Sequence, residues 1–130
     1  MAGMTYGGLT ISIITLLGAA IGLMNIMLVS VKERTREIGI RKAIGATPSI
    51  IRKQFLIEAI VICIMGGIGG IILGIAAGNI IAVSVSGSFT IPWEWLLIAL
   101  AACTIIGVVS GFYPAEKASR LDPIEALRYE

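Results

Sequence analysis

Two long runs without a charged residue constrain this chain more than any other feature. Residues Met1 to Val31 contain no Asp, Glu, Lys or Arg, and neither do residues Ala59 to Trp93. A helix of about 20 apolar residues crosses the hydrocarbon core of a bilayer, so both runs are long enough to span it. Because 57% of the 130 residues are hydrophobic and only 14% are charged, lipid is the expected solvent for most of the chain.

Three apolar segments emerge from the hydropathy pattern: residues 6–31, 55–85 and 95–113. Unpaired backbone groups are too costly in lipid, and the two-residue alternation of a barrel strand is missing, so each segment is expected to be a helix. The second segment is longer than a bilayer requires and is expected to tilt or protrude. The sequence therefore predicts an all-α membrane protein with three transmembrane helices.

The basic residues predict how these helices are oriented. Residues 32–53 hold seven of the ten Lys and Arg residues, and the tail, 114–130, holds the other three. Basic loops stay on the cytoplasmic side, so both segments are expected there, with the N-terminus and the loop 86–94 outside. No basic n-region or cleavage site precedes the first span, so it is not a signal peptide. We expect an upstream span and an external domain to be missing from this chain.

The segment between the first two spans is expected to form two helices joined by a tight corner. Glu37 and Arg41 stand four residues apart in the favourable order for a helical ion pair. Gly45 can end this charged helix, after which Thr47 and Pro48 supply an N-cap and a first-turn proline for the helix that enters the second span.

This charged helix also carries a small apolar edge, Ile40 and Ile44, spaced four residues apart among basic residues. Such an edge suits docking into a groove of a cytoplasmic partner. The alternative is a helix at the membrane surface whose charges only set the topology. In the tail, the run from Asp122 to Glu125 resembles a capping box and predicts a short final cytoplasmic helix, Pro123 to Tyr129.

Small residues recur along each span at intervals of four, which places them on one helix face. The second span carries Gly66, Gly70, Gly74 and Gly78, and the first carries Gly18 and Gly22. The third carries Ala99, Cys103, Gly107, Gly111 and Ala115. These stripes are expected to pack helices closely, either as ordinary contacts or as sliding surfaces in a moving assembly. Cys63 and Cys103 are interpreted as small packing residues.

Two of the polar residues in or near the spans, Asn25 and Glu58, call for an explanation. Asn25 is expected to hydrogen-bond to a neighbouring helix. Glu58 is expected near the cytoplasmic interface, where it can pair with a basic residue. No further ionisable groups lie deeper in the spans, which disfavours proton-coupled transport.

Several runs of residues resemble the permease region of MacB-type ABC transporters, the FtsX-like superfamily. They are MNIMLVSV at 24–31, ERTREIGIRKAIGA at 33–46, QFLIEA at 54–59 and YPAEKASRLDPIEALR at 113–128. The resemblance covers nearly the whole chain. It implies that the three spans match the second, third and fourth transmembrane helices of that family, in a bacterial plasma (inner) membrane.

The resemblance also implies a role for residues 33–45 as a coupling segment that meets a nucleotide-binding ATPase subunit. The residues expected at this interface are Glu33, Arg34, Arg36, Glu37, Ile40, Arg41, Lys42, Ile44 and Gly45. ATP-driven closure of two ATPases would move the spans of two permease copies, and through them an external domain, which is called mechanotransmission.

The sequence has no G-x-x-x-x-G-K-[ST] loop, so it is not expected to bind nucleotide or to be an enzyme itself. ATP and Mg are expected on the ATPase, with no cofactor on this chain, and no nucleic-acid partner is expected. Two alternatives stay open: a signalling or scaffold permease of the cell-division type, and a small autonomous helical membrane protein. The sequence does not encode the identity of a transported substrate.

Overall fold

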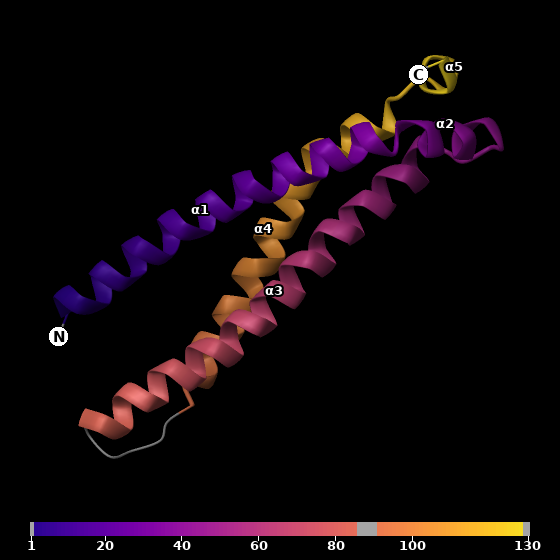
Figure 1. The fold of residues 1–130 in the computed structure, drawn as a ribbon. Coiled ribbons are helices and arrows are strands. Elements are labelled where there is room, and N and C mark those ends of the chain that lie inside the picture. The colour runs from indigo at the N-terminus through magenta and orange to yellow at the C-terminus, as the bar shows by residue number, and fades with distance from the viewer. Residues whose placement is uncertain (1, 86–90, 129–130) are drawn as a thin grey trace.

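The computed structural model describes residues 2–85 and 91–128, which form five α-helices (Figure 1). They are α1 (Ala2–Glu33), α2 (Thr35–Ala43), α3 (Pro48–Val85), α4 (Trp93–Ser119) and α5 (Pro123–Arg128). Within these ranges no strand occurs. Three of the helices, α1, α3 and α4, are long and apolar enough to cross a membrane. The predicted all-α fold with three spans is confirmed.

The helix ends differ from the apolar segments in instructive ways. α3 begins at Pro48, seven residues before the apolar segment 55–85, because the helix starts at the corner and not at the membrane. α4 continues six residues beyond Tyr113, to Ser119. Pro114 lies inside α4 and is fully buried. A proline within a helix is unfavourable, and the packing of Pro114 offsets this cost.

α3 and α4 run antiparallel side by side, and α1 packs on α4 (Figure 1). α2 and α5 pack on each other at one end of the bundle, which we call the basic end. At the opposite end, the far end, lie the start of α1 and the end of α3. Of the loop predicted at 86–94, residues 86–90 lie outside the described part of the chain.

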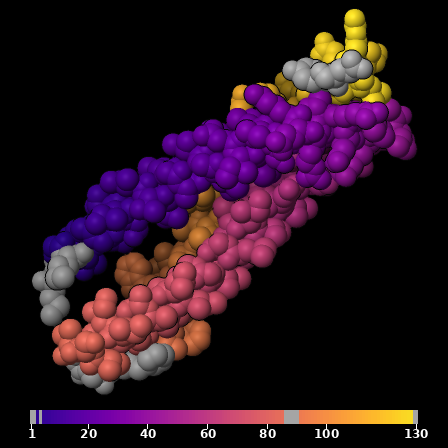
Figure 2. All heavy atoms as spheres, in the orientation of Figure 1, coloured from indigo at the N-terminus to yellow at the C-terminus, as the bar shows by residue number. Residues whose placement is uncertain are grey.

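The buried core lies at the basic end. Its hydrophobic members are Met27, Val31, Ile38, Ile51, Phe55, Ala59, Ala115, Ala118 and Ala126. Towards the far end α1 diverges from α3, and α4 is visible between them in the space-filling view (Figure 2). The three long helices therefore converge at the basic end, whereas towards the far end α1 separates from α3 and α4, which stay side by side (Figure 1).

The corner between α2 and α3 has the predicted glycine terminator and first-turn proline. Gly45 has a φ of 113°, which favours glycine, and the Ala46 and Gly45 amides donate to the Arg41 and Lys42 carbonyls at 2.9 and 3.0 Å. These two bonds make a Schellman motif that ends α2 and confirms the predicted glycine terminator. α3 follows with Pro48 as its first residue, as expected.

The cap of α5 is also confirmed, because the Asp122 carboxylate accepts a hydrogen bond from the Ile124 amide at 2.9 Å. α5 is described up to Arg128. The predicted helix end, Tyr129, lies outside the described residues.

Candidate coupling site and helix-packing surfaces

Arg34 connects the N-terminal end of α2 to α3. It occupies the break between α1 and α2, and its guanidinium lies 3.5 Å from the Glu58 carboxylate of α3 and 3.4 Å from that of Glu37. The same guanidinium carbon lies 6.0 Å from the centre of the Phe55 ring, within the range of a cation–π contact. Arg34 thus touches side chains of both α2 and α3, and Glu58 has the basic partner that its position suggested.

Lys42 connects the C-terminal end of α2 to the junction of α4 and α5. Its ammonium donates hydrogen bonds to the Ser119 carbonyl and, at 2.6 Å, to the Leu121 carbonyl. Carbonyls at a helix C-terminus attract cations. Burial lowers the pKa of Lys42 below its ordinary value, and the nearby charge of Asp122 opposes that shift. Lys42 is therefore an anchor between elements far apart in the sequence.

The prediction that Glu37 forms an ion pair with Arg41 is wrong. Glu37 pairs with Arg34, and the Arg41 guanidinium instead donates to the Gln54 side-chain oxygen at 2.7 Å. Arg41 lies just before the corner, so a partner on α3 is within reach of its long side chain. A hydrogen bond between these two helices replaces the helical pair.

The residues predicted at the coupling interface divide into anchors and an exposed group. Ile38 and Gly39 form the buried side of α2, and a Cβ added to Gly39 would lie 2.7 Å from the Ala126 Cβ of α5. The exposed members of the predicted interface are Glu33, Arg36, Glu37, Ile40, Arg41, Ile44 and Gly45. Ile44 is 83% exposed, so the apolar edge of α2 is open to a partner. α2 is thus held firmly on one side and presents mixed apolar and charged groups on the other.

Small residues form the contact between α3 and α4, which we call the seam: Ala59, Cys63 and Gly67 of α3 against Gly111, Gly107 and Cys103 of α4. A Cβ added to Gly111 would overlap that of Ala59. One added to Gly107 would lie 3.1 Å from the Cys63 Cβ, and one added to Gly67 would lie 2.8 Å from the Cys103 Sγ. Both cysteines are free thiols in this contact.

Within the described part of the chain, one predicted stripe does not pack against another helix. It consists of Gly66, Gly70, Gly74 and Gly78, and we call it the open stripe. A Cβ added to any of the four would find nothing within 4 Å among the described residues. Gly66 and Gly70 line a cavity of about 810 Å³ between α1, α3 and α4, at the gap seen in Figure 2. The four-residue interval places these glycines on one face, but the seam uses the neighbouring face.

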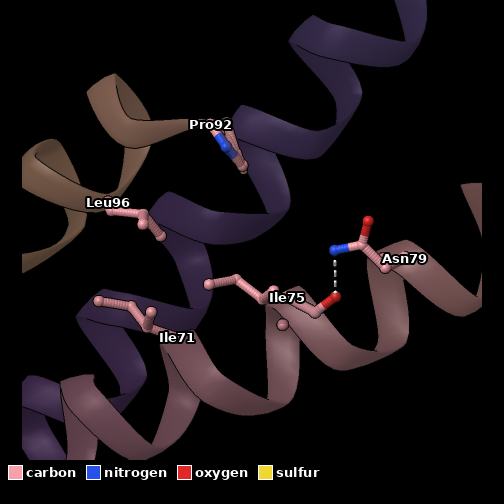
Figure 3. Close-up of a pocket in the computed structure, with 7 residues that line it drawn as sticks. Ile71, Ile75, Asn79, Pro92 and Leu96 are labelled. Atoms are coloured by element: carbon pink, nitrogen blue, oxygen red, sulfur yellow. Dashed lines mark hydrogen bonds between the residues drawn. The ribbon is translucent and has the colours of Figure 1, made fainter. Parts of the chain in front are cut away.

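The remaining two glycines of the stripe line a smaller hollow towards the far end, about 300 Å³ in volume. Ile71, Ile75 and Leu96 surround it, together with Pro92 at the start of α4 (Figure 3). Asn79 also borders it, and its amide donates to the Ile75 carbonyl of its own helix at 2.9 Å. The lining is mainly apolar and holds no cluster of chemically reactive groups.

Asn25 also differs from its expectation. It lies on an exposed face of α1, and its side chain makes no hydrogen bond to another helix within the described residues. The residues that the sequence interpretation missed are Gly39, Gly67 and the ion pairs of Glu116 with Arg52 and Arg120, at 3.3 and 2.8 Å. A weak signal for Gly67 existed, because Ala59, Cys63 and Gly67 are small residues four apart.

Within residues 2–85 and 91–128, no group of three or more His, Cys, Asp or Glu side chains could hold a metal ion. The described residues thus form closely packed long helices and a helix α2 that is bonded to α3 and to the α4–α5 junction. α2 also has an exposed apolar edge. These features define a multi-pass α-helical membrane protein.

The model of the family described as "FtsX-like permease C-terminal" matches residues 9–123. The chain therefore belongs to the FtsX-like permease family, and the resemblance seen in the sequence is confirmed.

The relatives are similar over most of this chain. A macrolide export ATP-binding/permease protein MacB of Photorhabdus laumondii is 53% identical over 121 residues, 92% of this chain and 19% of the relative. The MacB of Bordetella avium is 48% identical over 122 residues, again 92% and 19%. A probable syringafactin export ATP-binding/permease protein SyfD of Pseudomonas syringae is 52% identical over 123 residues, 90% and 18%. The chain thus spans about a fifth of the length of these curated relatives.

Proposed function

We propose that this chain is the membrane permease part of an ATP-binding cassette complex, in which an ATPase docks on α2 and drives export or an external motion. The relatives are named as export ATP-binding/permease proteins, which supports an export role over cell-division signalling or an autonomous small protein. ATP and Mg belong to the ATPase in this proposal, which assigns no catalytic group to this chain. A second permease copy completes the assembly.

The observation that carries the proposal is the two-sided character of α2. Arg34 and Lys42 join it to α3 and to the α4–α5 junction, while Ile44 is 83% exposed. A helix that only marked the topology would not need anchors at both ends. Force applied to the exposed side of α2 would reach α3 and α4 through these anchors, since both contacts are direct.

The basic residues support an orientation with α2 and α5 in the cytoplasm and the start of α1 outside a bacterial plasma membrane. Seven of the ten basic residues lie in 32–53, around α2. In this orientation the proposed docking helix lies on the side where ATP is available. The macrolide and syringafactin of the relatives' names are candidate classes of substrate, but an external domain would select among them.

The test is the coupling of ATP hydrolysis to the permease in the complete protein or complex. Ile44→Asp places a charge at the centre of the proposed contact and should lower permease-stimulated ATP hydrolysis about tenfold or more, because hot-spot apolar contacts contribute about 2 kcal/mol. Ile50→Asp is the matched control, since Ile50 is a 56% exposed isoleucine in the first turn of α3. Wild-type stimulation in Ile44→Asp would refute docking on α2.

A further inference from the structure

A hollow at the basic end gathers cations from three helices. It has a volume of about 480 Å³ and is lined by Lys42 of α2, Arg52 of α3 and Arg120 at the end of α4, together with Glu116. A neighbouring hollow of about 470 Å³ shares Glu116 and Arg120 and adds Lys117. We call the two together the basic groove.

The positive charges in the basic groove exceed the negative ones. Four cations, Lys42, Arg52, Lys117 and Arg120, line it with a single carboxylate. Glu116 accepts from Arg120 at 2.8 Å and pairs with Arg52 at 3.3 Å. A guanidinium has five N–H donors, so one carboxylate leaves most of these donors available. The side chains of Arg52 and Arg120 are 46% and 79% exposed, so an anion can reach both.

The depth of the groove matches the boundary of a membrane. Tyr113, which lines the second hollow, ends the apolar segment 95–113, and Glu116 follows one helical turn later, about 5 Å along the axis. Tyrosine and basic side chains at a span end lie at the level of the lipid headgroups. Val109 and Phe112, in the preceding turn of α4, are 68% and 54% exposed and offer apolar surface to acyl chains.

We propose that the basic groove binds the phosphate of an anionic phospholipid, with its acyl chains along the exposed apolar surface of α4. Arginine pairs with phosphate oxygens through two parallel hydrogen bonds, and basic pockets beside transmembrane helices suit anionic headgroups. The two arginines are already oriented by Glu116, which competes with the phosphate for them. This inference does not depend on an ATPase docking on α2.

The experiment measures lipid binding to the whole chain in detergent by native mass spectrometry, with phosphatidylglycerol or phosphatidylcholine added. Phosphatidylglycerol should bind about tenfold more tightly, since each nearby basic residue favours an anionic lipid. Arg52→Gln with Arg120→Gln should reduce that preference to about twofold or less. Lys53→Gln with Arg128→Gln removes the same charge outside the groove and should keep it.

A gain of binding separates the proposal from simple misfolding. Glu116→Gln removes the competing carboxylate, so its preference for phosphatidylglycerol should rise about threefold above that of the unmodified chain. Equal binding of the two lipids by the unmodified chain would overturn the proposal, as would an equal loss in the control pair. Binding of inorganic phosphate to the groove together with equal binding of the two lipids would assign the groove to a soluble anion and overturn the proposal of a lipid ligand.

Discussion

At the basic end, α3 and α4 are in contact through small residues, and Lys42 and Arg34 add hydrogen bonds and ion pairs from α2. On the neighbouring face of α3, the same kind of residue, glycine at intervals of four, faces cavities of about 810 and 300 Å³. Glycine spacing therefore does not by itself identify a contact. What distinguishes the two faces of α3 is close contact with α4, which is present at the seam and lacking at the open stripe among the described residues.

The largest effect is expected when a glycine of the seam is replaced and the result is compared with the same replacement on the open stripe. Gly111→Leu forces a side chain into the space of the Ala59 Cβ and should lower the free energy of unfolding by about 3 kcal/mol. Gly74→Leu, on the open stripe, should change it by less than about 0.5 kcal/mol. Titration with SDS in mixed micelles measures both values. Similar losses in the two variants would mean that the seam is no tighter than the open stripe.

The second prediction concerns the anchor of α2. Lys42→Met removes two charge-assisted hydrogen bonds to carbonyls and should cost about 2 kcal/mol of the free energy of unfolding. Hydrogen exchange should also become faster in α5, because Lys42 bonds to the Leu121 carbonyl just before it. Lys53→Met, an exposed lysine of α3, is the control. Unchanged exchange in α5 after Lys42→Met would argue against the anchor.

The third prediction concerns the corner between α2 and α3. Gly45→Ala should destabilise the chain by about 1 kcal/mol, because its φ of 113° disfavours a residue with a Cβ. Gly69→Ala makes the same substitution in a regular helix with no atom within 4 Å of the new Cβ, and it should not destabilise. Comparing the two unfolding curves tests the corner, and a loss in Gly69→Ala alone would contradict it.

The most local effect is expected at α5. Asp122→Ala removes the hydrogen bond to the Ile124 amide and should destabilise this six-residue helix by about 1 kcal/mol locally. Hydrogen exchange at the Ile124 amide reports the change, while the three long helices should keep their protection. Asp122→Asn keeps a capping oxygen and should behave like the unmodified chain. Loss of protection throughout α3 would show that the cap supports more than α5.

The spans, the end of α2 at Gly45 and the cap of α5 at Asp122 could be predicted from the sequence because their causes are local, whereas the continuation of α4 through Pro114 was not predicted. Uncharged runs define the spans, and the Gly45 and Asp122 signals act on backbone groups within a few residues. The fold class followed from these features and from the cost of unpaired backbone groups in lipid. Family resemblance added the expected role of residues 33–45.

The side-chain partners could not be predicted in the same way. Glu37 could pair with a neighbour on either side, and only the approach of α3 gives Arg41 its bond to Gln54. The rotation of α3 about its axis decides which stripe faces α4, and two neighbouring stripes of small residues were available. The pairing of Ala59 with Gly111 depends on the register of the two helices, which the spacing within either one does not contain.

The closest contact of the seam lies far from the middle of α3, and this has a geometric consequence. The helix has 38 residues, and Ala59, where it meets Gly111 most closely, lies 11 residues from Pro48 and 26 from Val85. At 1.5 Å per residue the two arms measure about 17 and 39 Å. If α3 tilts about Ala59, Val85 moves about 2.4 times as far as Pro48. α3 would then act as an unequal lever, in which a small displacement at the corner becomes a larger one on the opposite side of the membrane.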